Sequence, residues 1–246
     1  MQLEIAVLSR TGGRSVNEDA CGFWSGHGAC FCVVSDGAGG HRGGDVASKL
    51  VVEELLSWFR ERHGCTGDAI EAAMRSANEA VVGKQRSDEQ LSDMHATVVI
   101  LAVDSDRGLA TWGHLGDSRL YCFRQHEIIV QSRDHSVVQS MVDAGYLQSH
   151  EMRNSPDRNK LLKALGDENS FEPTVQRHAL PLLDQDVFLL CTDGLWEHVE
   201  ESQMVHTLEN SVSAEDWLRL LESQVLARAN VTHDNYSAIA VWCHQV

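Results

Sequence analysis

Two matching stretches of the sequence combine residue types that suit metal chemistry. Asp36 follows the apolar run ACFCVVS (29–35), and Asp193 follows the apolar run VFLLCT (187–192). In both places a glycine comes directly after the aspartate. Glycine permits a sharp turn and leaves room for a ligand to approach the backbone. The repeated pattern therefore places a carboxylate, a hard oxygen donor, beside an open stretch of backbone.

Three further aspartates have positions that fit the same site. Asp19 and Asp234 lie just before the strand-like runs 21–25 and 237–242, and Asp117 lies in the turn-like sequence LGDS. In an antiparallel sheet, the end of one strand lies beside the beginning of its neighbour. Aspartates that end some strands and begin others are therefore expected to converge at one edge.

Carboxylates that converge repel one another, and each raises the pKa of the others unless cations join them. Oxygen donors without histidine or cysteine suit Mg²⁺ or Mn²⁺. A single Asp-Gly pair would be explained more simply as a tight turn. Two such pairs after matching apolar runs, together with Glu-Asp at 18–19 and Asp-Asn at 234–235, favour a divalent metal site.

Other glycine-rich motifs do not fit the stretch after Asp36. A dinucleotide-binding G-x-G-x-x-G that began at Gly37 would need glycine where Arg42 stands. A P-loop that ended at Gly44 would need lysine where Asp45 stands. The glycines therefore do not indicate nucleotide binding.

The elements that must position these residues follow from hydrophobic patterning. Four nearly continuous apolar runs predict strands covered on both faces, at 29–35, 96–103, 187–192 and 237–242. Shorter strands are predicted at 3–9 and 21–25, and the segments 108–116 and 119–123 around GDS predict a hairpin. Amphipathic stripes predict helices at 45–62, 68–84 and 213–228, and a further helix is expected within 136–147. Clustered strands and blocks of helices favour α+β layering over β-α alternation.

Composition limits the possible partners and domain count. The chain has 43% apolar and 23% charged residues and only three prolines, with no linker-like tract, so one domain over residues 1–246 is expected. A formal net charge of −16 repels phosphate backbones and anionic lipid. We therefore expect neither a nucleic-acid partner nor a membrane partner.

The N-terminus and the cysteines indicate the compartment. MQLEIAVLSR lacks the pattern of a signal peptide, and no apolar run approaches the roughly 20 residues that span a bilayer, so a cytoplasmic location is expected. The seven cysteines show no C-x-x-C spacing. Cys30 and Cys32 fall on one face of a predicted strand and are expected to be small buried hydrophobes.

Seven motifs along the chain resemble those of the metal-dependent protein phosphatases of the PPM type, also called protein phosphatase 2C. In the family's order they are RSVNEDA (14–20), SDGAGGH (35–41), GDSRLY (116–121), RDHS (133–136), LLKALG (161–166), CTDGLWE (191–197) and DNYSAIAV (234–241). Each motif alone is weak, but seven in order are specific. The resemblance covers roughly residues 3–243, and the compact length is similar to that of bacterial members.

The resemblance implies a fold and an activity. The fold is a four-layer α-β-β-α sandwich of two antiparallel sheets flanked by helices, with metals at one end. The activity is hydrolysis of phosphoserine and phosphothreonine on proteins, with two core Mn²⁺ or Mg²⁺ ions. A serine/threonine kinase is the natural partner of such an enzyme, and we expect a monomer because no apolar helix face is left over.

The resemblance also implies roles for the residues that match. Asp36 would bridge two ions, and the Gly37 carbonyl would bind one of them. Asp193 and Asp234 would bind the other ion. Asp19 would act mainly through water on a metal.

Two more roles follow from the same motifs. Asp117, with Asp193, would hold a third, weaker ion that bacterial members have. Arg14 would grip the substrate phosphate, and a guanidinium suits this role because it donates two parallel hydrogen bonds. A pair of ions roughly 3.5–4 Å apart can activate one shared water for in-line attack without a covalent enzyme intermediate.

The sequence departs from the family pattern in three places. Some members carry a histidine, proposed as the acid for the leaving group, where this chain has Ala38; His41 or a metal-bound water could replace it. The family's Gly-Thr-Thr is HAT (95–97) here. The segment 143–165, which we call the flap, matches the family only in position and is expected to select substrates.

Two other functions are consistent with part of the pattern. A catalytically weak relative would bind phosphoproteins as a signalling module, and a related metallohydrolase would act on small phosphate esters. Retention of Asp36, Asp193 and Asp234 favours the active protein phosphatase.

Overall fold

The structure is a computed structural model that describes residues 1–39, 43–168 and 170–245. Its elements in chain order, with η marking a 3₁₀ turn, are β1 (Gln2–Arg10), β2 (Asp19–Gly26), β3 (Ala29–Ala38), α1 (Gly43–Arg62), α2 (Gly67–Ser87), η2 (Glu89–Leu91), β4 (His95–Ala96), β5 (Val98–Asp104), β6 (Leu109–Leu115), β7 (Arg119–Arg124), β8 (Glu127–Gln131), α3 (Val137–Asp143), η3 (Ser149–Asn154), β9 (Thr174–Val175), β10 (Leu180–Pro181), β11 (Val187–Cys191), α4 (Asp193–Trp196), α5 (Glu201–Glu209), α6 (Ala214–Arg228) and β12 (Tyr236–His244).

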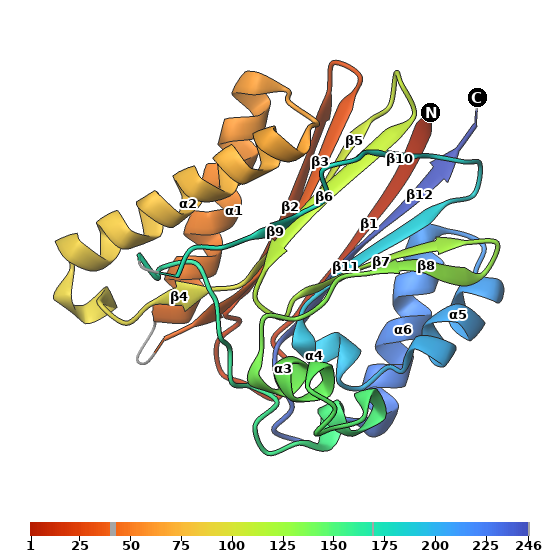
Figure 1. The fold of residues 1–246 in the computed structure, drawn as a ribbon. Helices are drawn as coiled ribbons and strands as arrows, with labels where there is room; N and C mark the ends of the chain where they lie inside the picture. Colours follow the sequence, from red (N-terminus) through yellow and green to blue (C-terminus); the bar gives the residue numbers. More distant parts are fainter. Residues whose placement is uncertain (40–42, 169, 246) are drawn as a thin grey trace.

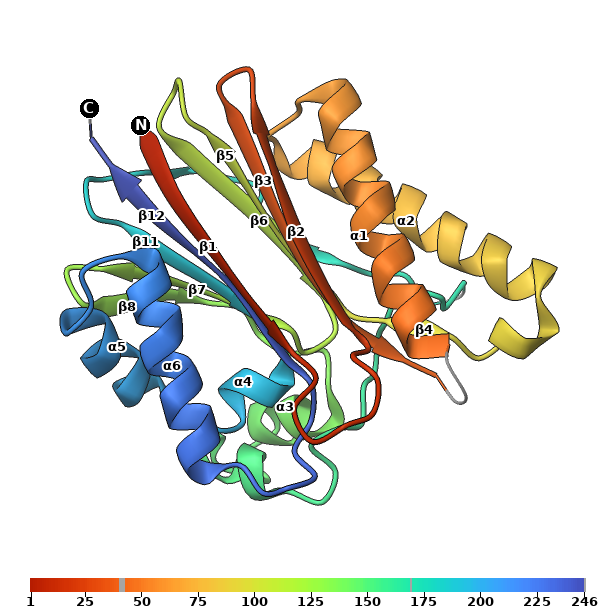
Figure 2. The ribbon, with the colours of Figure 1, turned by 180° about the vertical axis from the view of Figure 1, so that it is seen from behind.

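Two antiparallel sheets meet face to face (Figure 1). One has the strand order β1-β12-β11-β7-β8, and the other has the order β10-β6-β5-β3-β2, with β4 beside β3 and β9 beside β6. Helices α1 and α2 cover the outer face of the second sheet, and α5 and α6 cover the outer face of the first (Figure 2). The four-layer α-β-β-α sandwich implied by the resemblance is confirmed.

Strand β3 shows why the apolar runs are nearly continuous. Phe31 and Val33 point outward into the core beneath α1 and α2, whereas Cys30, Cys32 and Val34 point inward into the core between the sheets. Both faces of the strand are covered, so both sets of alternating side chains must be apolar. The prediction that Cys30 and Cys32 are buried free thiols is confirmed.

The hairpin predicted around GDS is wrong. Strand β6 pairs with β5, and β7 pairs with β11 and β8, so the two strands belong to different sheets. Residues 116–118 therefore carry the chain from one sheet to the other. Both runs are apolar on both faces, and this pattern predicts a central strand without identifying its neighbours.

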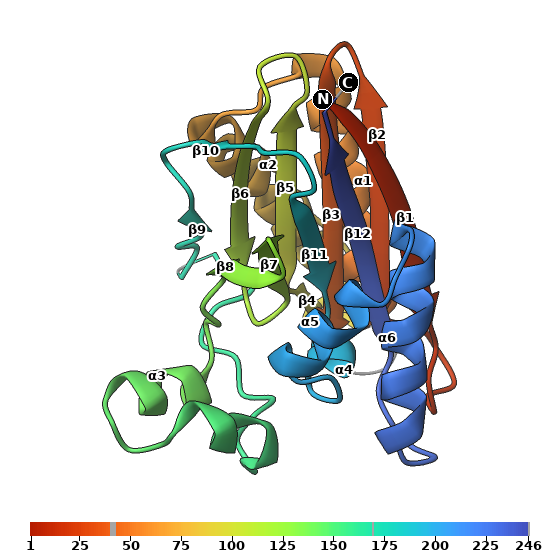
Figure 3. The same cartoon turned by 90° about the vertical axis from the view of Figure 1, so that its right-hand side faces the viewer.

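The flap and its preceding helix lie beyond the end of the sheets, where α3 is seen in Figure 3. Helix α3 is shorter than the expected span 136–147, because Gly145 adopts a left-handed φ of 77° just past its end. The amides of Gly145 and Tyr146 donate to the carbonyls of Val142 and Met141, which is the Schellman pattern of a helix C-terminus.

Little of the flap is packed. Between residues 143 and 163, all of which are described, Met152 is the only buried side chain. Tyr146 is 81% exposed. No helix in the described parts of the chain is long and apolar enough to cross a lipid bilayer.

The outer helical layer allows a direct test of the packing. Leu55 of α1 is fully buried in the core with Phe31. Leu55→Ala should lower the free energy of unfolding by about 2–5 kcal/mol, because it removes buried apolar surface and leaves a cavity. Urea denaturation measures this loss.

Leu226→Ala, at a 57% exposed position of α6, is the matched control. It should change the free energy of unfolding by less than about 0.5 kcal/mol. Equal losses in the two variants would contradict the packing described for α1.

Candidate metal centre

Antiparallel pairing brings the aspartates to one end of the sandwich. Asp36, near the end of β3, is the cross-strand partner of Asp19, the first residue of β2. Asp193 begins α4 directly after β11. Asp234 lies two residues before β12, and Asp117 lies in the crossing between β6 and β7.

A cavity of about 200 Å³ opens at this end of the molecule. Its lining includes Arg14, Glu18, Asp36, Gly37, Asp117, Asn159, Leu161, Asp193, Asp234 and Asn235. Six of the seven residues singled out from the sequence thus line one cavity. The seventh, Asp19, is buried, and the charge of Asp193 is among the groups that shift its pKa.

The carboxylates strongly disfavour one another's charge. Burial raises the pKa of Asp36 well above its usual range, and the charges of Asp193 and Asp19 raise it further. Burial, and then the charge of Asp234, raise the pKa of Asp193 to about 6, although a hydrogen bond with Asp36 lowers it in part. Burial and the charge of Asp193 raise the pKa of Asp19 to about 7. The pKa of Asp117 is raised by burial and then by Asp193.

These properties fit a divalent cation. The acidic side chains of the cavity offer only oxygen donors, as Mn²⁺ and Mg²⁺ prefer. Oδ1 of Asp19 is buried without a hydrogen-bond partner. Gly37 lies so close to the backbone that a Cβ there would stand 1.9 Å from the Gly44 carbonyl oxygen. Cations would relieve the repulsion that the raised pKa values express.

The side chains are not arranged as a finished ligand shell. In the described residues, no three histidine, cysteine, aspartate or glutamate side chains close around one point. Asp234 Oδ2 instead accepts a 2.8 Å ion-pair hydrogen bond from Arg14 Nη2. Small divalent ions usually keep several waters in proteins, so a few carboxylates that shift toward the ion are sufficient.

Asn235 positions the loop that carries Arg14. Its Nδ2 donates to the carbonyls of Thr11 and Val16, and its Oδ1 accepts from the Glu18 amide, at distances of 2.7–2.9 Å. Sequence reasoning did not assign this residue. Its position directly after Asp234, in the motif DNYSAIAV, is the signal that could have identified it.

Thr97 positions Asp36. The Asp36 amide donates to Thr97 Oγ1 at 3.0 Å, and the Thr97 amide donates to the Asp36 carbonyl at 2.8 Å. Oγ1 of Thr97 also shares a 2.7 Å hydrogen bond with Ser118, the neighbour of Asp117. Packing at the altered HAT motif is intact, since Ala96 is buried and pairs with Gly37.

Thr192 plays the same part for Asp19. Its hydroxyl donates to Asp19 Oδ2 at 2.9 Å and accepts from the Ser237 amide at 3.0 Å. The hydroxyl residue before Asp193 is thus a positioning group for a carboxylate on another strand.

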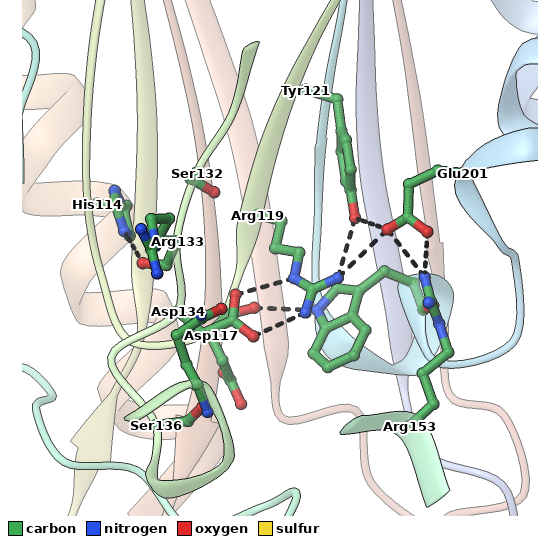
Figure 4. A network of polar contacts seen from close by, with 12 residues as sticks. His114, Asp117, Arg119, Tyr121, Ser132, Arg133, Asp134, Ser136, Arg153 and Glu201 are labelled. Atoms are coloured by element: carbon green, nitrogen blue, oxygen red, sulfur yellow. Dashed lines mark hydrogen bonds and ion pairs between the residues drawn. The ribbon is translucent and has the colours of Figure 1, made fainter. Parts of the chain in front are cut away.

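A buried ionic network supports Asp117 from the other side (Figure 4). Trp196 Nε1 donates to the Asp117 carbonyl at 2.9 Å, and the Arg119 guanidinium stacks 3.5 Å from the centre of the Trp196 ring. Arg119 also makes two 2.8 Å hydrogen bonds to Asp134. None of these three supporting residues was predicted to have a role, although they lie in the motifs GDSRLY, RDHS and CTDGLWE.

The acid for the leaving group is not assigned. Ala38 is exposed at the end of β3, and its methyl group carries no proton to give. His41, the replacement considered from the sequence, lies outside the described residues.

Comparison with known proteins agrees with this geometry. The family model for Protein phosphatase 2C matches residues 9–231. The serine/threonine phosphatase stp of Listeria monocytogenes is 33% identical over 183 residues, which are 72% of this chain and 71% of that protein. The crystal structure of the Mycobacterium tuberculosis serine/threonine phosphatase PstP/Ppp has a TM-score of 0.86 and 28% identity, with 99% of both chains covered.

A second PstP structure bears on the cofactor. It shows the catalytic domain in complex with two manganese ions, and it has a TM-score of 0.85 and 26% identity, with 99% of both chains covered. Dependence on Mn²⁺ or Mg²⁺, expected from the sequence, is supported by this relative and by the family match. The chain belongs to the protein phosphatase 2C family and is a metal-dependent serine/threonine protein phosphatase.

Proposed function

We propose that the cavity at the end of the sandwich is the site at which this phosphatase hydrolyses phosphoserine and phosphothreonine. The observation that carries the proposal is the convergence of Asp36, Asp117, Asp193 and Asp234 with Arg14 on one cavity of about 200 Å³. Such a cavity accommodates a phosphorylated side chain, while the rest of a protein substrate stays outside.

The core ligands would be Asp36, as the bridge between two ions, the Gly37 carbonyl, Asp193 and Asp234. Asp19, which is buried next to these ligands, would act mainly through a water molecule on one of the ions. When bound, the ions offset the charge of the phosphate and lower the pKa of a water that attacks phosphorus. The chain contributes by fixing these oxygens through hydrogen bonds such as that between Thr97 and Asp36.

Arg14 and Asp234 would each exchange partners during the cycle. Their mutual ion pair is exposed, so its net contribution to stability is small. Asp234 would serve as a metal ligand, and the Arg14 guanidinium, once separated from it, would clamp two phosphate oxygens.

Asp117, with Asp193, would hold a third and weaker ion. Its main chain is fixed on one side by Trp196 and, through its neighbour Ser118, by Thr97 on the other. The leaving group would take its proton from water unless His41 supplies it.

We propose one phosphatase domain over residues 1–246, with the flap at 143–165 selecting among phosphoproteins. A serine/threonine kinase would supply these substrates. The monomeric state, the cytoplasmic location and the lack of nucleic-acid and membrane partners stay predictions.

Phosphate release from a phosphoserine protein tests the proposed function. Release should stop when EDTA removes divalent ions and should return when Mn²⁺ is added, because without cations the carboxylates repel the phosphate dianion and nothing offsets its charge. A colorimetric phosphate assay with the protein substrate, and in parallel with sugar phosphates, measures this. Turnover of the sugar phosphates alone would favour the small-ester alternative, and no turnover of either would favour the binding module.

Asp36→Asn tests the bridging role in two ways. Turnover should fall by more than about a hundredfold, since even the outer partners of metal ligands cost 10–100-fold. In metal-free protein the same variant should melt a few degrees higher than the wild type, because it removes a buried carboxyl whose raised pKa costs stability at neutral pH, an effect on the order of 1 kcal/mol. With Mn²⁺ the wild type should instead melt at the higher temperature, because the ion binds it more tightly and stabilises it more.

Asp106→Asn, at an exposed turn at the opposite end of the sandwich, is the control and should leave both measurements unchanged. Near-normal turnover of Asp36→Asn would exclude the bridging assignment.

Arg14→Ala separates phosphate binding from metal binding. We expect kcat/KM for a phosphoprotein to fall roughly 10–100-fold, about the value of one or two charge-assisted hydrogen bonds. Inhibition by inorganic phosphate should weaken in parallel. Mn²⁺ affinity, measured by calorimetry, should be equal or higher, because Asp234 no longer has a competing partner. A loss of Mn²⁺ affinity as large as in Asp36→Asn would show that Arg14 supports the metals instead.

A further inference from the structure

One side chain of the flap makes three polar contacts with the body of the enzyme. Arg153, in η3, donates from Nη2 to both carboxylate oxygens of Glu201 at 2.9 Å (Figure 4). Its Nε donates to the Trp196 carbonyl at 2.9 Å. The Arg153 side chain is 17% exposed and that of Glu201 30%, so the pair is partly shielded from water.

The rest of the flap is held mainly at its two ends. The Val137 amide donates to the Lys160 carbonyl and the Leu162 amide to the His135 carbonyl, and ion pairs join Arg133 to Asp143 and Lys163 to Glu172. Met152, beside Arg153, is the flap's one buried side chain between residues 143 and 163. A second ion pair joins Arg158 to Glu197 at 2.9 Å. Segments with so little buried apolar surface open locally at low free-energy cost. Between its ends, the flap is therefore held against the body largely by Met152 and by the contacts of these two arginines.

The acceptor side of the Arg153 contact is rigid. Glu201 also accepts a hydrogen bond from Tyr121 at 3.2 Å and lies 3.6 Å from Arg119. Arg119 is in turn fixed by its buried pair with Asp134. Although burial alone would raise the pKa of Glu201, the charge of Arg153 helps to lower it, so this carboxylate is ionised at neutral pH. The flap is thus anchored to a group that cannot easily move.

The contact also shapes a groove beside the proposed site. A cavity of about 670 Å³ lies between the flap and the beginning of α5, and Arg153 and His150 line it on one side and Glu197 and Glu201 on the other. Glu197 lies one helical turn beyond Asp193. A polypeptide whose phosphorylated residue enters the smaller cavity therefore has room for its neighbouring residues here.

We propose that Arg153 is a positioning residue that holds the flap against Glu201 and Trp196 and thereby keeps the groove in shape for protein substrates. The placement of the substrate rests on the proposed function. A small phosphate ester in the smaller cavity meets the flap only at Asn159 and Leu161 and does not extend to Arg153, which lines the larger cavity, so its turnover does not need this contact. The structure thus assigns to Arg153 a role in substrate selection and none in the chemical step.

Hydrogen–deuterium exchange of the metal-free protein tests the anchor itself. In Arg153→Met, which keeps the apolar stem, amides of residues 143–163 should exchange roughly tenfold faster, the order expected for a lost charge-assisted hydrogen bond. Arg153→Lys should give an intermediate rate, because an ammonium cannot reproduce the planar set of contacts. Arg219→Met, which removes an exposed ion pair with Asp216 on α6, should leave the flap unchanged.

Kinetics with Mn²⁺ test the consequence for substrates. For Arg153→Met, KM for a phosphoprotein should rise about tenfold while kcat changes less than twofold. With p-nitrophenyl phosphate both constants should stay within about twofold of the wild type. If Arg153 contributed only to stability, neither KM nor kcat would differ between the two substrates. Equal losses on the two substrates would overturn the proposal.

A double-mutant cycle identifies the partner. If Glu201 receives the contact, Arg153→Met should have little further effect on flap exchange in a Glu201→Gln background. Additive effects, or unchanged exchange in Arg153→Met alone, would also overturn the proposal. The exchange measurements need neither metal nor substrate, so they remain interpretable if Asp36→Asn disproves the site assignment.

Discussion

Repulsion between carboxylates held out of water is the constraint on which the rest of the structure depends. The charges of Asp193 and Asp19 raise the pKa of the buried Asp36, and the charge of Asp193 raises the pKa of the buried Asp19. Such a group stays together only where the backbone leaves its members no alternative. Here two of them face each other across paired strands, and a third is fixed by the beginning of a helix. The sandwich supplies the rigidity, and divalent ions supply the opposite charge.

Much of this end of the molecule could be predicted from patterning. Apolar runs marked the central strands, and the rule that antiparallel neighbours exchange ends predicted convergence of Asp36 with Asp19 and Asp234. The pairing of strands could not be predicted in the same way. The crossing that carries Asp117 was mistaken for a hairpin, because a run that is apolar on both faces has no preferred neighbour. The resemblance to a known family, rather than periodicity, predicted the order of layers.

The supporting groups were harder to predict, since their partners are distant in sequence. The hydroxyl of Thr192 serves a carboxylate 173 positions away, at Asp19, and Trp196 serves the Asp117 carbonyl 79 positions away. A single threonine or tryptophan has no periodicity, and its hydrogen-bond partner is set only when the sheets have formed. Arg119 illustrates the same limit, because its buried pair with Asp134 depends on two motifs that meet only in the folded chain.

The carboxylates and the flap differ in how firmly the rest of the molecule holds them, and this difference has a physical reason. Oxygens that share cations must keep their geometry to within a fraction of an ångström, so they are carried by strands, a helix start and mutual hydrogen bonds. Proteins that bear a phosphate vary in shape around it, so the surface that meets them gains from a low cost of adjustment. Contacts from Arg153 and Arg158 join the loosely packed flap to α4 and to the start of α5, elements that continue directly from Asp193. The flap and the carboxylates are therefore joined through α4, the short helix that begins at Asp193.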